Sequence, residues 1–385
     1  MADSDFPIAT ASFDARPAHP VRLTHTAPPV PVSVRPHPRE NDTELKSRID
    51  DPFLLMPLEG PLVDRYSRVH DDLRISVTDR CNLRCVYCMP EVGMTFQPRE
   101  ALLTFEEIER VATVAYEMGV TSLRLTGGEP LVRKNLVSLV SRLSGIGFKD
   151  LAITTNGMLL SPVVQGLADA GLKRVNISCD SLREKRFNAI RRRGDLNTVL
   201  RAMDAVEAAG LSPLKINVVI LRAENDDEIL DFATFARDTN RVVRFIEFMP
   251  LDAQGQWDKS QLVPGREIFE RINAVWPLRA VDVGGSAPAE RFKFADGLGE
   301  IGLISSVTQP FCGTCNRLRL TADGAIRNCL FSDNEFSLRD LMRDDGSDDE
   351  IALMLRKAVW EKFPGHAINE PGFLRPTRSM SMIGG

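Results

Sequence analysis

From about residue 72 onward, short runs of apolar residues alternate with longer stretches in which apolar residues recur at helical spacing. Strands that alternate with helices in this way are typical of parallel sheets with crossover helices. Two amphipathic stretches, Thr104–Met118 and Thr198–Ala209, are predicted helices, and Thr104 with Glu107 predicts a capping box at the start of the first. The predicted strands are Leu73–Thr78, Ser122–Thr126, Leu151–Thr155, Arg174–Ser178, Leu214–Ile220 and Val242–Phe248. Six such units predict an α/β fold, either a partial (β/α)6 barrel or an open doubly wound sheet.

The chain divides into three predicted parts. Residues 1–65 are rich in proline before residue 40 and carry no apolar period, so they read as a disordered or loosely attached extension. Residues 66–262 hold the six strand–helix units. Residues 263–385 follow after that pattern has ended, and they form the third part.

Composition narrows the class of protein. The 385 residues are 43% hydrophobic and 26% charged, with a net charge of −5, which is ordinary for a globular protein with a sizeable core. The acidic balance argues against a general affinity for nucleic acid or an anionic membrane. No run reaches about 18 apolar residues, and the first residues lack the apolar segment of a secretory signal. We therefore expect a cytoplasmic protein without a membrane span.

Cysteine spacing is the strongest chemical signal. The seven cysteines form two groups with one left over, which suits metal binding in a reducing compartment better than disulfides. The first group, Cys81, Cys85 and Cys88, follows the first predicted strand. These thiols are too close together for a disulfide framework and one ligand short of a closed zinc site. On a [4Fe–4S] cluster, three thiolates leave one iron open, although a Cys-x2-Cys pair by itself favours zinc.

The second group, Cys312, Cys315 and Cys329, lies in the C-terminal part and again has three members. No fourth thiol or histidine follows nearby, and Cys179 reads as a small buried residue rather than a ligand. Between the second and third thiols, Arg317 and Arg319 lie on the same side of an extended segment. Paired guanidinium groups beside an open iron favour an anionic substrate, whereas without the cysteines they would be a solvated charge pair.

The loop after the second predicted strand carries a third motif. Gly127 and Gly128 lack Cβ atoms where the backbone would approach a ligand, and Glu129 supplies a carboxylate that can accept hydrogen bonds from an ammonium group. An isolated Gly-Gly turn before Pro130 would be the simpler interpretation. In a barrel, however, functional residues gather at the carboxyl ends of the strands, which is where this loop lies. Lys215, at the start of the fifth predicted strand, is an exception to that rule.

The first cysteine group, with Tyr87 directly before Cys88, resembles the signature of the radical S-adenosylmethionine (SAM) superfamily. Five further segments complete the resemblance: 126–130, 153–157, 244–249, 311–319 and the C-terminal Ser-Met-Ile-Gly-Gly at 381–385. Together they resemble the MoaA-type GTP 3′,8-cyclase family over residues 66–385. The resemblance implies a partial (β/α)6 TIM-like barrel of the radical SAM type, with a C-terminal extension that carries a second iron–sulfur cluster.

The resemblance also implies roles for individual residues. Two [4Fe–4S] clusters would be held by Cys81, Cys85 and Cys88 and by Cys312, Cys315 and Cys329. SAM would contact Tyr87, Gly128, Glu129, Ser178 and Met249. GTP would contact Arg74, Arg124, Thr154, Lys215, Arg317, Leu318 and Arg319. The catalytic residues would be Arg317, Arg319, Gly384 and Gly385, because the Gly-Gly tail of this family is expected to reach into the active site and position a basic group.

The implied reaction begins the biosynthesis of the molybdenum cofactor. Reductive cleavage of SAM gives a 5′-deoxyadenosyl radical, which takes the hydrogen atom from C3′ of GTP. The C3′ radical attacks C8 of guanine, and reduction with protonation gives (8S)-3′,8-cyclo-7,8-dihydroguanosine 5′-triphosphate. Implied partners are a single-electron donor of the flavodoxin or ferredoxin type, the downstream cyclic pyranopterin monophosphate synthase and a second copy in a homodimer, with neither nucleic acid nor membrane.

Two alternatives remain open. A radical SAM enzyme that modifies a peptide and carries an auxiliary cluster would share the first motif, but it would not explain the pair Arg317 and Arg319. A structural module in which zinc holds loops together would use the same cysteines without any reaction. Analysis of bound metal separates the zinc module from the enzymes, because two clusters require about eight irons with matching sulfide.

Overall fold

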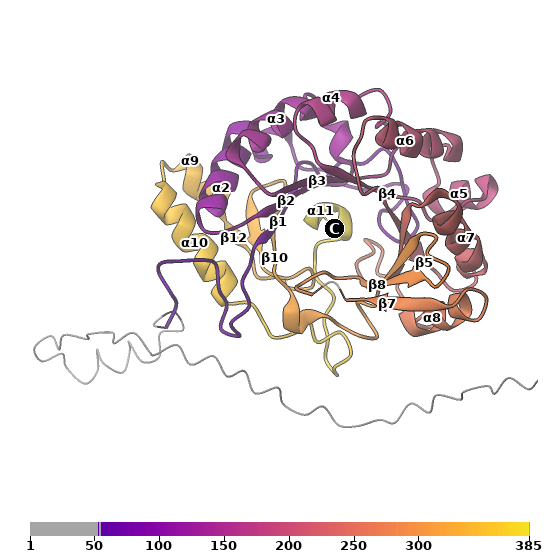
Figure 1. Cartoon of the computed structure of the whole chain (residues 1–385). Coiled ribbons are helices and arrows are strands. Elements are labelled where there is room, and N and C mark those ends of the chain that lie inside the picture. Colours follow the sequence, from indigo (N-terminus) through magenta and orange to yellow (C-terminus); the bar gives the residue numbers. More distant parts are fainter. Residues whose placement is uncertain (1–52, 54, 283, 385) are drawn as a thin grey trace, which may run out of the picture. The chain divides into compact units, whose positions relative to one another are not determined.

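One twelve-stranded sheet organises the part of the chain that the structure describes (Figure 1). The structure is a computed structural model, and it describes residue 53 and residues 55–384 other than 283. The predicted extension over residues 1–65 therefore falls mostly outside the described residues. The strand order is β12-β11-β10-β1-β2-β3-β4-β5-β6-β9-β8-β7. Within the described residues, no helix is long and apolar enough to cross a membrane.

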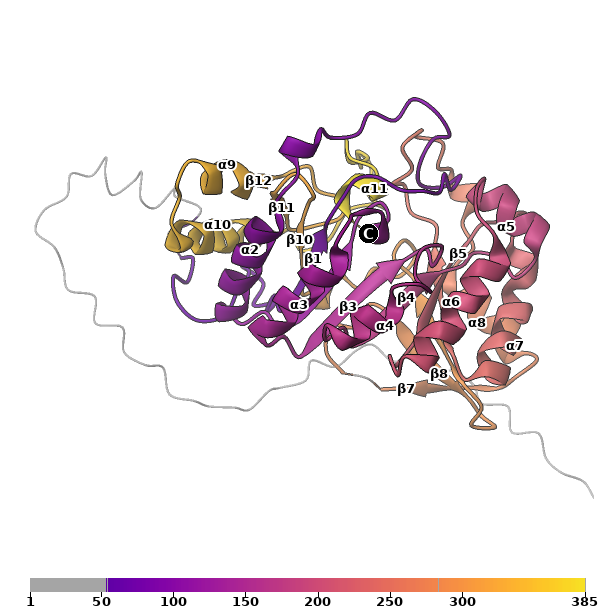
Figure 2. The ribbon, with the colours of Figure 1, turned by 90° about the horizontal axis from the view of Figure 1, so that it is seen from above.

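The first six strands are parallel neighbours in sequence order, as predicted. Their bounds differ from the prediction by at most two residues at either end: β1 Asp72–Ser76, β2 Ser122–Thr126, β3 Asp150–Thr155, β4 Arg174–Ser178, β5 Lys215–Ile220 and β6 Val242–Glu247. The crossover helices are α2 Phe105–Glu117, α3 Leu136–Ile146, α4 Val164–Asp169, α5 Glu184–Arg191, α6 Leu196–Ala208, α7 Ile229–Thr239 and α8 Gly265–Asn273. The helices line the outer face of the curved sheet (Figures 1 and 2). The partial barrel is thus confirmed, and so is the capping box of Thr104 and Glu107 on α2.

Apolar and polar side chains alternate along β1, so that one face of this strand packs in the hydrophobic core and the other faces the barrel interior. In β1, Leu73 and Ile75 are fully buried in the hydrophobic core, on the same side as the apolar stripe of α2. Successive side chains of a strand point to opposite faces, so Asp72, Arg74 and Ser76 face the other way, into the barrel. The interior of this barrel is therefore lined with polar groups instead of being filled by apolar side chains.

The C-terminal part extends both edges of the barrel sheet, which the sequence did not predict. Strand β9 (Glu300–Ile304) pairs in parallel with β6, and β10 (Arg317–Leu320) pairs in parallel with β1. Antiparallel strands complete the sheet on either side: β7 Leu278–Val281, β8 Glu290–Phe294, β11 Ala325–Arg327 and β12 Phe336–Ser337. Strands from both sides of the predicted boundary between residues 262 and 263 thus belong to one sheet. The boundary itself stays a prediction.

The remaining helices close the structure from two sides. Helix α9 (Leu338–Arg343) and helix α10 (Asp348–Trp360) lie beside α2 at one end of the sheet (Figure 1). The short helix α11 (Met380–Ile383) lies inside the curve of the sheet, and the second view places it near the same strands (Figure 2). The C-terminal segment thus enters the barrel interior.

A buried carboxylate joins the barrel to the C-terminal part. Glu247, at the end of β6, is only 1% exposed. Its Oε1 accepts a hydrogen bond from the main-chain N–H of Gly265 at 2.8 Å, and its Oε2 accepts from the N–H groups of Val307 and Thr308, both at 2.8 Å. A charged acceptor that serves several buried N–H groups stabilises their positions strongly.

Glu247→Ala is expected to lower the free energy of unfolding by about 3 kcal/mol, because it leaves the buried N–H groups of Gly265 and Val307 and the partly buried N–H of Thr308 without an acceptor. Glu247→Gln keeps the shape and one acceptor oxygen, so its loss should be about half as large. Thermal and urea unfolding monitored by circular dichroism measure both. If the alanine variant unfolded with the wild-type midpoint, Glu247 would not hold the two parts together.

Candidate active site

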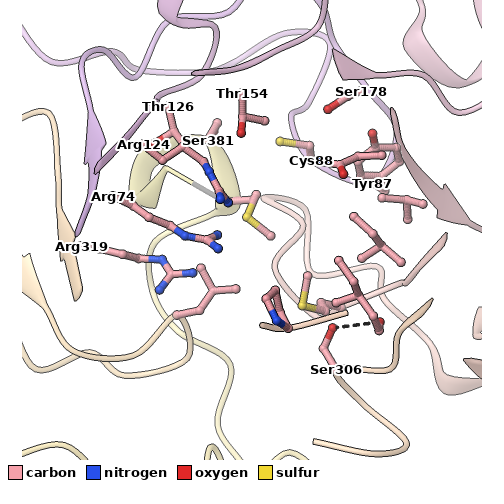
Figure 3. Close-up of a pocket in the computed structure, with 18 of the residues that line it drawn as sticks. Arg74, Tyr87, Cys88, Arg124, Thr126, Thr154, Ser178, Ser306, Arg319 and Ser381 are labelled. Atoms are coloured by element: carbon pink, nitrogen blue, oxygen red, sulfur yellow. Dashed lines mark hydrogen bonds between the residues drawn. The ribbon is translucent and has the colours of Figure 1, made fainter. Parts of the chain in front are cut away.

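One cavity of about 280 Å³ collects nearly all the residues that the sequence singled out (Figure 3). It lies at the carboxyl ends of the barrel strands, where loops after β1, β2, β3 and β4 meet the segment around β10. All six cysteines of the two groups line it. The seventh, Cys179, is buried elsewhere and donates to the Ser181 carbonyl, so it is not a ligand candidate.

The first thiol group lies on the loop after β1 and receives hydrogen-bond donors from its surroundings. The Leu83 N–H lies 3.4 Å and the Asn156 side-chain nitrogen 3.8 Å from the Cys81 sulfur. The Arg191 Nη1 lies 3.6 Å from the Cys85 sulfur. Donors of this kind stabilise a thiolate that binds a metal.

Arg191 was missed by the sequence reasoning, because nothing in its local sequence distinguishes it from Arg192 and Arg193. It is buried, and its Nη2 lies 2.7 Å from the carboxylate of Asp180. The same carboxylate accepts a hydrogen bond from the Tyr87 hydroxyl at 2.7 Å. Asp180 therefore fixes both Tyr87 and the guanidinium group beside the first thiol group.

Burial disfavours the ionised form of the first thiols. It raises the pKa of Cys81 to about 11, and it also raises the pKa values of Cys85 and Cys88. These thiols are therefore protonated at neutral pH until a metal centre replaces the protons, which is the usual linkage between metal binding and thiol ionisation.

The second thiol group has a different electrostatic environment. Cys312 opens the 3-10 helix η5 (Cys312–Thr314), and Cys315 follows that helix. The sulfur of Cys315 lies 3.3 Å from Lys362 Nζ and 3.4 Å from an Arg317 nitrogen. Although burial opposes ionisation, these two cations lower the pKa of Cys315 to about 6. Lys362, far along the chain, was also missed, since it carries no local signal.

The arrangement of the thiols fits a group larger than one ion. Among the described residues, no three side chains of His, Cys, Asp or Glu converge closely enough to hold a single metal ion. A cluster of several irons does not need such convergence, because its thiolate ligands bind different irons. Six free thiols in two groups around one cavity therefore fit two clusters, one for each group.

The glycines of the loop after β2 are needed first for packing of the chain on itself. A Cβ on Gly128 would lie 2.4 Å from the Arg80 carbonyl oxygen, and one on Gly127 would lie 2.6 Å from the Thr78 carbonyl oxygen. The N–H groups of Gly128 and Glu129 donate to those same two carbonyls. The close approach predicted toward a ligand is thus, in the structure, an approach to the backbone that leads into the cysteine loop.

Glu129 is held rigidly at the cavity wall. It is 1% exposed, and its carboxylate accepts hydrogen bonds from the Thr155 hydroxyl and the Asn156 N–H, both at 2.7 Å, and from the Leu131 N–H at 3.1 Å. Burial nevertheless raises its pKa to about 7. A carboxylate in this state gains from an ammonium group placed beside it.

Strand register aligns three guanidinium groups in one row. Arg74 on β1 is directly opposite Arg319 on β10 and Arg124 on β2. Neighbouring strands lie about 4.8 Å apart, so the three groups are near neighbours, and all point into the cavity (Figure 3). Their Nε atoms, and that of Arg317, are buried without a hydrogen-bond partner. The row is a set of donors suited to a polyanion.

Burial and mutual repulsion destabilise the charged forms of these guanidinium groups. Burial and the neighbouring Arg124 lower the pKa of Arg74, and burial together with Arg317 lowers the pKa of Arg319 to about 10. Arg244 on β6, which the sequence reasoning did not assign, also lines the cavity, and burial with the nearby Arg124 lowers its pKa to about 9. An anion bound among these groups would relieve both effects.

Lys215 lies at the opposite end of the barrel interior. It lines a second cavity of about 300 Å³, whose wall shares Arg124 and Arg244 with the first. Lys215 is the first residue of β5, whereas the first cavity lies at the carboxyl ends of the barrel strands. Lys215 therefore lies on the floor of the same barrel interior. Burial and the neighbouring Arg244 lower its pKa to about 7.

The other predicted contact residues divide into three groups. Tyr87, Thr154, Ser178 and Met249 line the cavity as expected. Leu318 is 1% exposed, and its side chain packs in the hydrophobic core on the far side of β10, so only its main chain is available to a ligand. Gly385 lies outside the described residues.

The C-terminal segment is anchored before it enters the barrel. Arg378 forms two hydrogen bonds of 2.9 Å with the carboxylate of Asp323 and one of 2.7 Å with Glu335. Beyond this anchor, Ser381 lines the cavity, and its main-chain N–H bonds to Cys88. A Cβ on Gly384 would lie 2.5 Å from the Thr126 hydroxyl and 2.8 Å from Ser76 Cβ. Only glycine fits between β1 and β2 at this point.

Comparisons with known proteins agree with this site. Residues 75–236 match the family model of the radical SAM superfamily, and residues 241–368 match the model described as Molybdenum Cofactor Synthesis C. Two solved structures share the fold at low identity. The protein anSMEcpe with bound AdoMet has a TM-score of 0.52 at 14% identity, covering 77% of this chain and 82% of that chain. Streptococcus suis SuiB bound to S-adenosylmethionine has a TM-score of 0.53 at 13% identity, covering 83% and 77%. The fold and the first thiol group define the class of radical SAM enzymes, whose members use a [4Fe–4S] cluster with SAM.

Similar sequences narrow the class further. A GTP 3′,8-cyclase of Corynebacterium glutamicum is 44% identical over 369 residues, covering 91% of this chain and 98% of that protein. Those of Rhodopirellula baltica and Thermodesulfovibrio yellowstonii are 46% and 45% identical, each over 84% of this chain and over 92% and 99% of their own lengths. The chain belongs to the GTP 3′,8-cyclase family.

Gly384→Ala is expected to displace the C-terminal segment from the barrel, because the added Cβ has no room. Gly372→Ala is a matched control: both glycines have a positive φ, of 79° and 89°, but no atom lies within 4 Å of a Cβ at Gly372. Limited trypsin digestion should cleave after Arg378, the bond before Ser379, about five- to tenfold faster in the Gly384 variant, since the released segment opens more often. Equal cleavage of the two variants would mean that the tight passage does not hold the segment.

Proposed function

We propose that this protein converts GTP to (8S)-3′,8-cyclo-7,8-dihydroguanosine 5′-triphosphate, the first step of molybdenum cofactor biosynthesis. The observation that carries the proposal is one cavity lined by two three-cysteine groups and by a row of in-register guanidinium groups. The sulfur groups suit two clusters, and the guanidinium groups suit a triphosphate. The relatives, which share 42–46% of their residues with this chain, carry the name of this activity.

Cys81, Cys85 and Cys88 would hold the first [4Fe–4S] cluster, which supplies one electron for the reductive cleavage of SAM. The chain's own residues would bind and orient SAM. The buried carboxylate of Glu129 would accept hydrogen bonds from its ammonium group beside Gly128, whereas Tyr87, Ser178 and Met249 would contact the rest of the molecule. Asp180 and Arg191 would keep Tyr87 and the cysteine loop in place.

Cys312, Cys315 and Cys329 would hold a second [4Fe–4S] cluster near the guanine base. Lys362 and Arg317 already favour the thiolate at Cys315, which supports a metal ligand at that position. The catalytic roles of Arg317, Arg319, Gly384 and Gly385 are proposed on the same basis. Arg317 and Arg319 lie at the cavity wall, and Gly384 lies at the barrel wall between β1 and β2.

The triphosphate would lie along the arginine row. Arg74, Arg124 and Arg319 line the cavity, and their buried Nε atoms have no hydrogen-bond partner. Thr154 adds a hydroxyl, and Lys215 lines the neighbouring cavity that shares Arg124 and Arg244 with the first. A polyanion would offset the repulsion among these cations, and closely spaced cations attract a triphosphate even into an acidic protein. The Leu318 main chain is the remaining contact proposed for GTP.

The proposed function also implies partner proteins and a role for each part of the chain. A small one-electron donor protein of the flavodoxin or ferredoxin type would reduce the first cluster, and a cyclic pyranopterin monophosphate synthase would take the product. We propose a homodimer as the assembly. The barrel over residues 66–262 would contribute SAM binding, and residues 263–385 would contribute the second cluster and the tail. Of the predicted extension over residues 1–65, the described end packs with the barrel, since Leu62 is 1% exposed in the hydrophobic core.

The direct test is anaerobic reconstitution with iron and sulfide, followed by incubation with SAM, dithionite and each nucleoside triphosphate in turn. We expect about eight irons per chain, and we expect 5′-deoxyadenosine together with an isomer of GTP to form only when GTP is present. Mass spectrometry detects both products.

Two variants separate the cysteine groups in this assay. Cys81→Ser should abolish SAM cleavage, whereas Cys329→Ser should retain some cleavage without the cyclised nucleotide. SAM cleavage by the wild type that leaves GTP unchanged would contradict the substrate. Zinc without sulfide would contradict the reaction itself.

Lys215 should make GTP binding dependent on pH. In the free protein its pKa is about 7, so the amine loses its proton above that pH, and a bound phosphate would raise this pKa by favouring the charged form. Above pH 7, Lys215 therefore takes up a proton when GTP binds. The KM for GTP should rise several-fold between pH 7 and 9, and uptake of one proton limits the slope to about tenfold per pH unit.

The matched variant is Lys215→Arg, whose guanidinium keeps its charge over this range, with Lys149→Arg on the surface as a control. The pH dependence of the KM should flatten in Lys215→Arg and persist in Lys149→Arg. A wild-type slope in Lys215→Arg would show that Lys215 does not sense the triphosphate.

A further inference from the structure

Ion pairing among the arginines is uneven over the molecule. Within the described residues, most arginines outside the cavity have a carboxylate within 4 Å, for example Arg183 with Asp227 and Arg343 with Glu107. Of those without such a partner, the majority gather on or beside the cysteine loop. We call these six the loop surface: Arg80, Arg84, Arg99, Arg133, Arg192 and Arg193. A protein with a net charge of −5 thus carries a concentrated positive surface at one place.

Among the described residues, no carboxylate lies within 4 Å of these six arginines, although Glu106 and Glu107 lie close enough to Arg133 to attract it. The nearest ones on α2 are already engaged, since Glu106 pairs with Arg142 at 2.9 Å and Glu107 pairs with Arg343 at 2.8 Å. Asp79, next to Arg80, is buried, and its carboxylate accepts the Gln97 N–H at 2.6 Å. The like charges therefore repel one another and leave a local field that attracts an anionic partner.

The loop surface is connected directly to the first thiol group. Arg80 precedes Cys81 in the chain, and Arg84 Nη1 donates to the Cys81 carbonyl oxygen at 2.7 Å. Arg80 and Arg84 lie over the same ring, that of Phe96, at 5.8 and 5.7 Å. The Arg84 N–H also donates to the Arg191 carbonyl oxygen, which places Arg192 and Arg193 beside the loop. A protein bound to Arg80 or Arg84 would therefore lie close to Cys81, because Arg80 is its neighbour in the chain and Arg84 contacts its carbonyl oxygen.

A groove continues the loop surface toward α2. Its volume is about 700 Å³, and its charged lining is four cations, Arg80, Arg99, Arg133 and Lys134, with one carboxylate, that of Glu106. Arg133 is fixed there by hydrogen bonds to the Val77 and Leu103 carbonyl oxygens, so part of the charge is held in a rigid position. Fixed charge around a hollow suits a protein surface of opposite sign and complementary shape.

We propose that the loop surface and its groove are the docking site of an acidic one-electron donor protein of the flavodoxin or ferredoxin type. This inference rests on the proposed function, in which Cys81, Cys85 and Cys88 hold a cluster that must receive one electron per turnover. The donor is oxidised by one electron, and the cluster is reduced by one. An acidic redox protein fits better than nucleic acid or a membrane, because the positive surface surrounds the cysteine loop and the rest of the chain is acidic overall.

The test variant reverses charges that have no structural role in the fold. Arg99, Lys134 and Arg193 are exposed, and no ion pair or side-chain hydrogen bond of theirs occurs within the described residues; all three are changed to Glu. The control changes three equally exposed cations far from the loop, Arg279, Lys149 and Lys293, to Glu. Both triple variants alter the net charge by the same amount.

The measurement is stopped-flow bleaching of the reconstituted holoenzyme's cluster absorption by a reduced acidic flavodoxin, in the absence of GTP. The loop-surface variant should be reduced at least about tenfold more slowly than the control variant at low salt, and the steep fall of the wild-type rate with ionic strength should be lost. Reduction by dithionite at high salt should be nearly equal in all three proteins, because this small anion needs no docking site and salt screens its attraction to the loop surface.

Each outcome decides the proposal. Equal reduction of the two triple variants by flavodoxin overturns it. If dithionite also reduced the loop-surface variant slowly, the cysteine loop itself would be altered, and Lys134→Glu alone, outside that loop, would decide in the same assay. Binding to anionic vesicles that is lost in the loop-surface variant, with flavodoxin reduction unchanged, would assign the surface to a membrane. The reduction assay contains no GTP, so its result does not depend on the substrate. If the wild type took up clusters but failed to cyclise GTP, that result would contradict the proposed function and leave the docking site unaffected.

Discussion

The register between three parallel strands is the constraint on which the site depends. Because β10 pairs with β1 and β1 pairs with β2 without offset, Arg319, Arg74 and Arg124 fall into one row, and the same pairing brings the second thiol group to the cavity of the first. A shift by one residue would turn each of these side chains into the hydrophobic core. The C-terminal part is therefore an edge of the barrel that completes its interior.

Burial gives the cavity its electrostatic character. Cations that repel one another share a space with few carboxylates, while the two thiol groups differ, since burial raises the pKa of Cys81 and nearby cations lower that of Cys315. The free energy spent on holding Arg74 and Arg319 in this position is recovered when a polyanion binds. The rigid hydrogen bonds around Glu129 and Glu247 keep this unfavourable arrangement in place.

The sequence predicted those features that depend on local pattern. Six apolar runs gave the six parallel strands nearly to the residue, and cysteine spacing identified both thiol groups. It did not predict that β9 and β10 would join the barrel edges, because strand pairing between distant segments leaves no periodic signal. Arg191 and Lys362 were missed for the same reason: each reaches a cysteine through the fold, from a position whose sequence neighbours form no motif. Lys215 was found only through family resemblance, since its place at the start of a strand suggested no role.

The pairing of β1 with β10 also orders events during synthesis. Asn316 and Asp71, which are joined by a hydrogen bond at the start of this pairing, are 245 residues apart. At about 5–20 residues per second, the ribosome delivers the first cysteine loop about 10–50 s before the strand that completes its cavity. During that interval the growing chain has one open edge on β1 and three thiols without the second thiol group beside them. Delivery of iron and sulfide to the first group can thus precede closure of the barrel, whereas the second group becomes available only when closure is nearly complete.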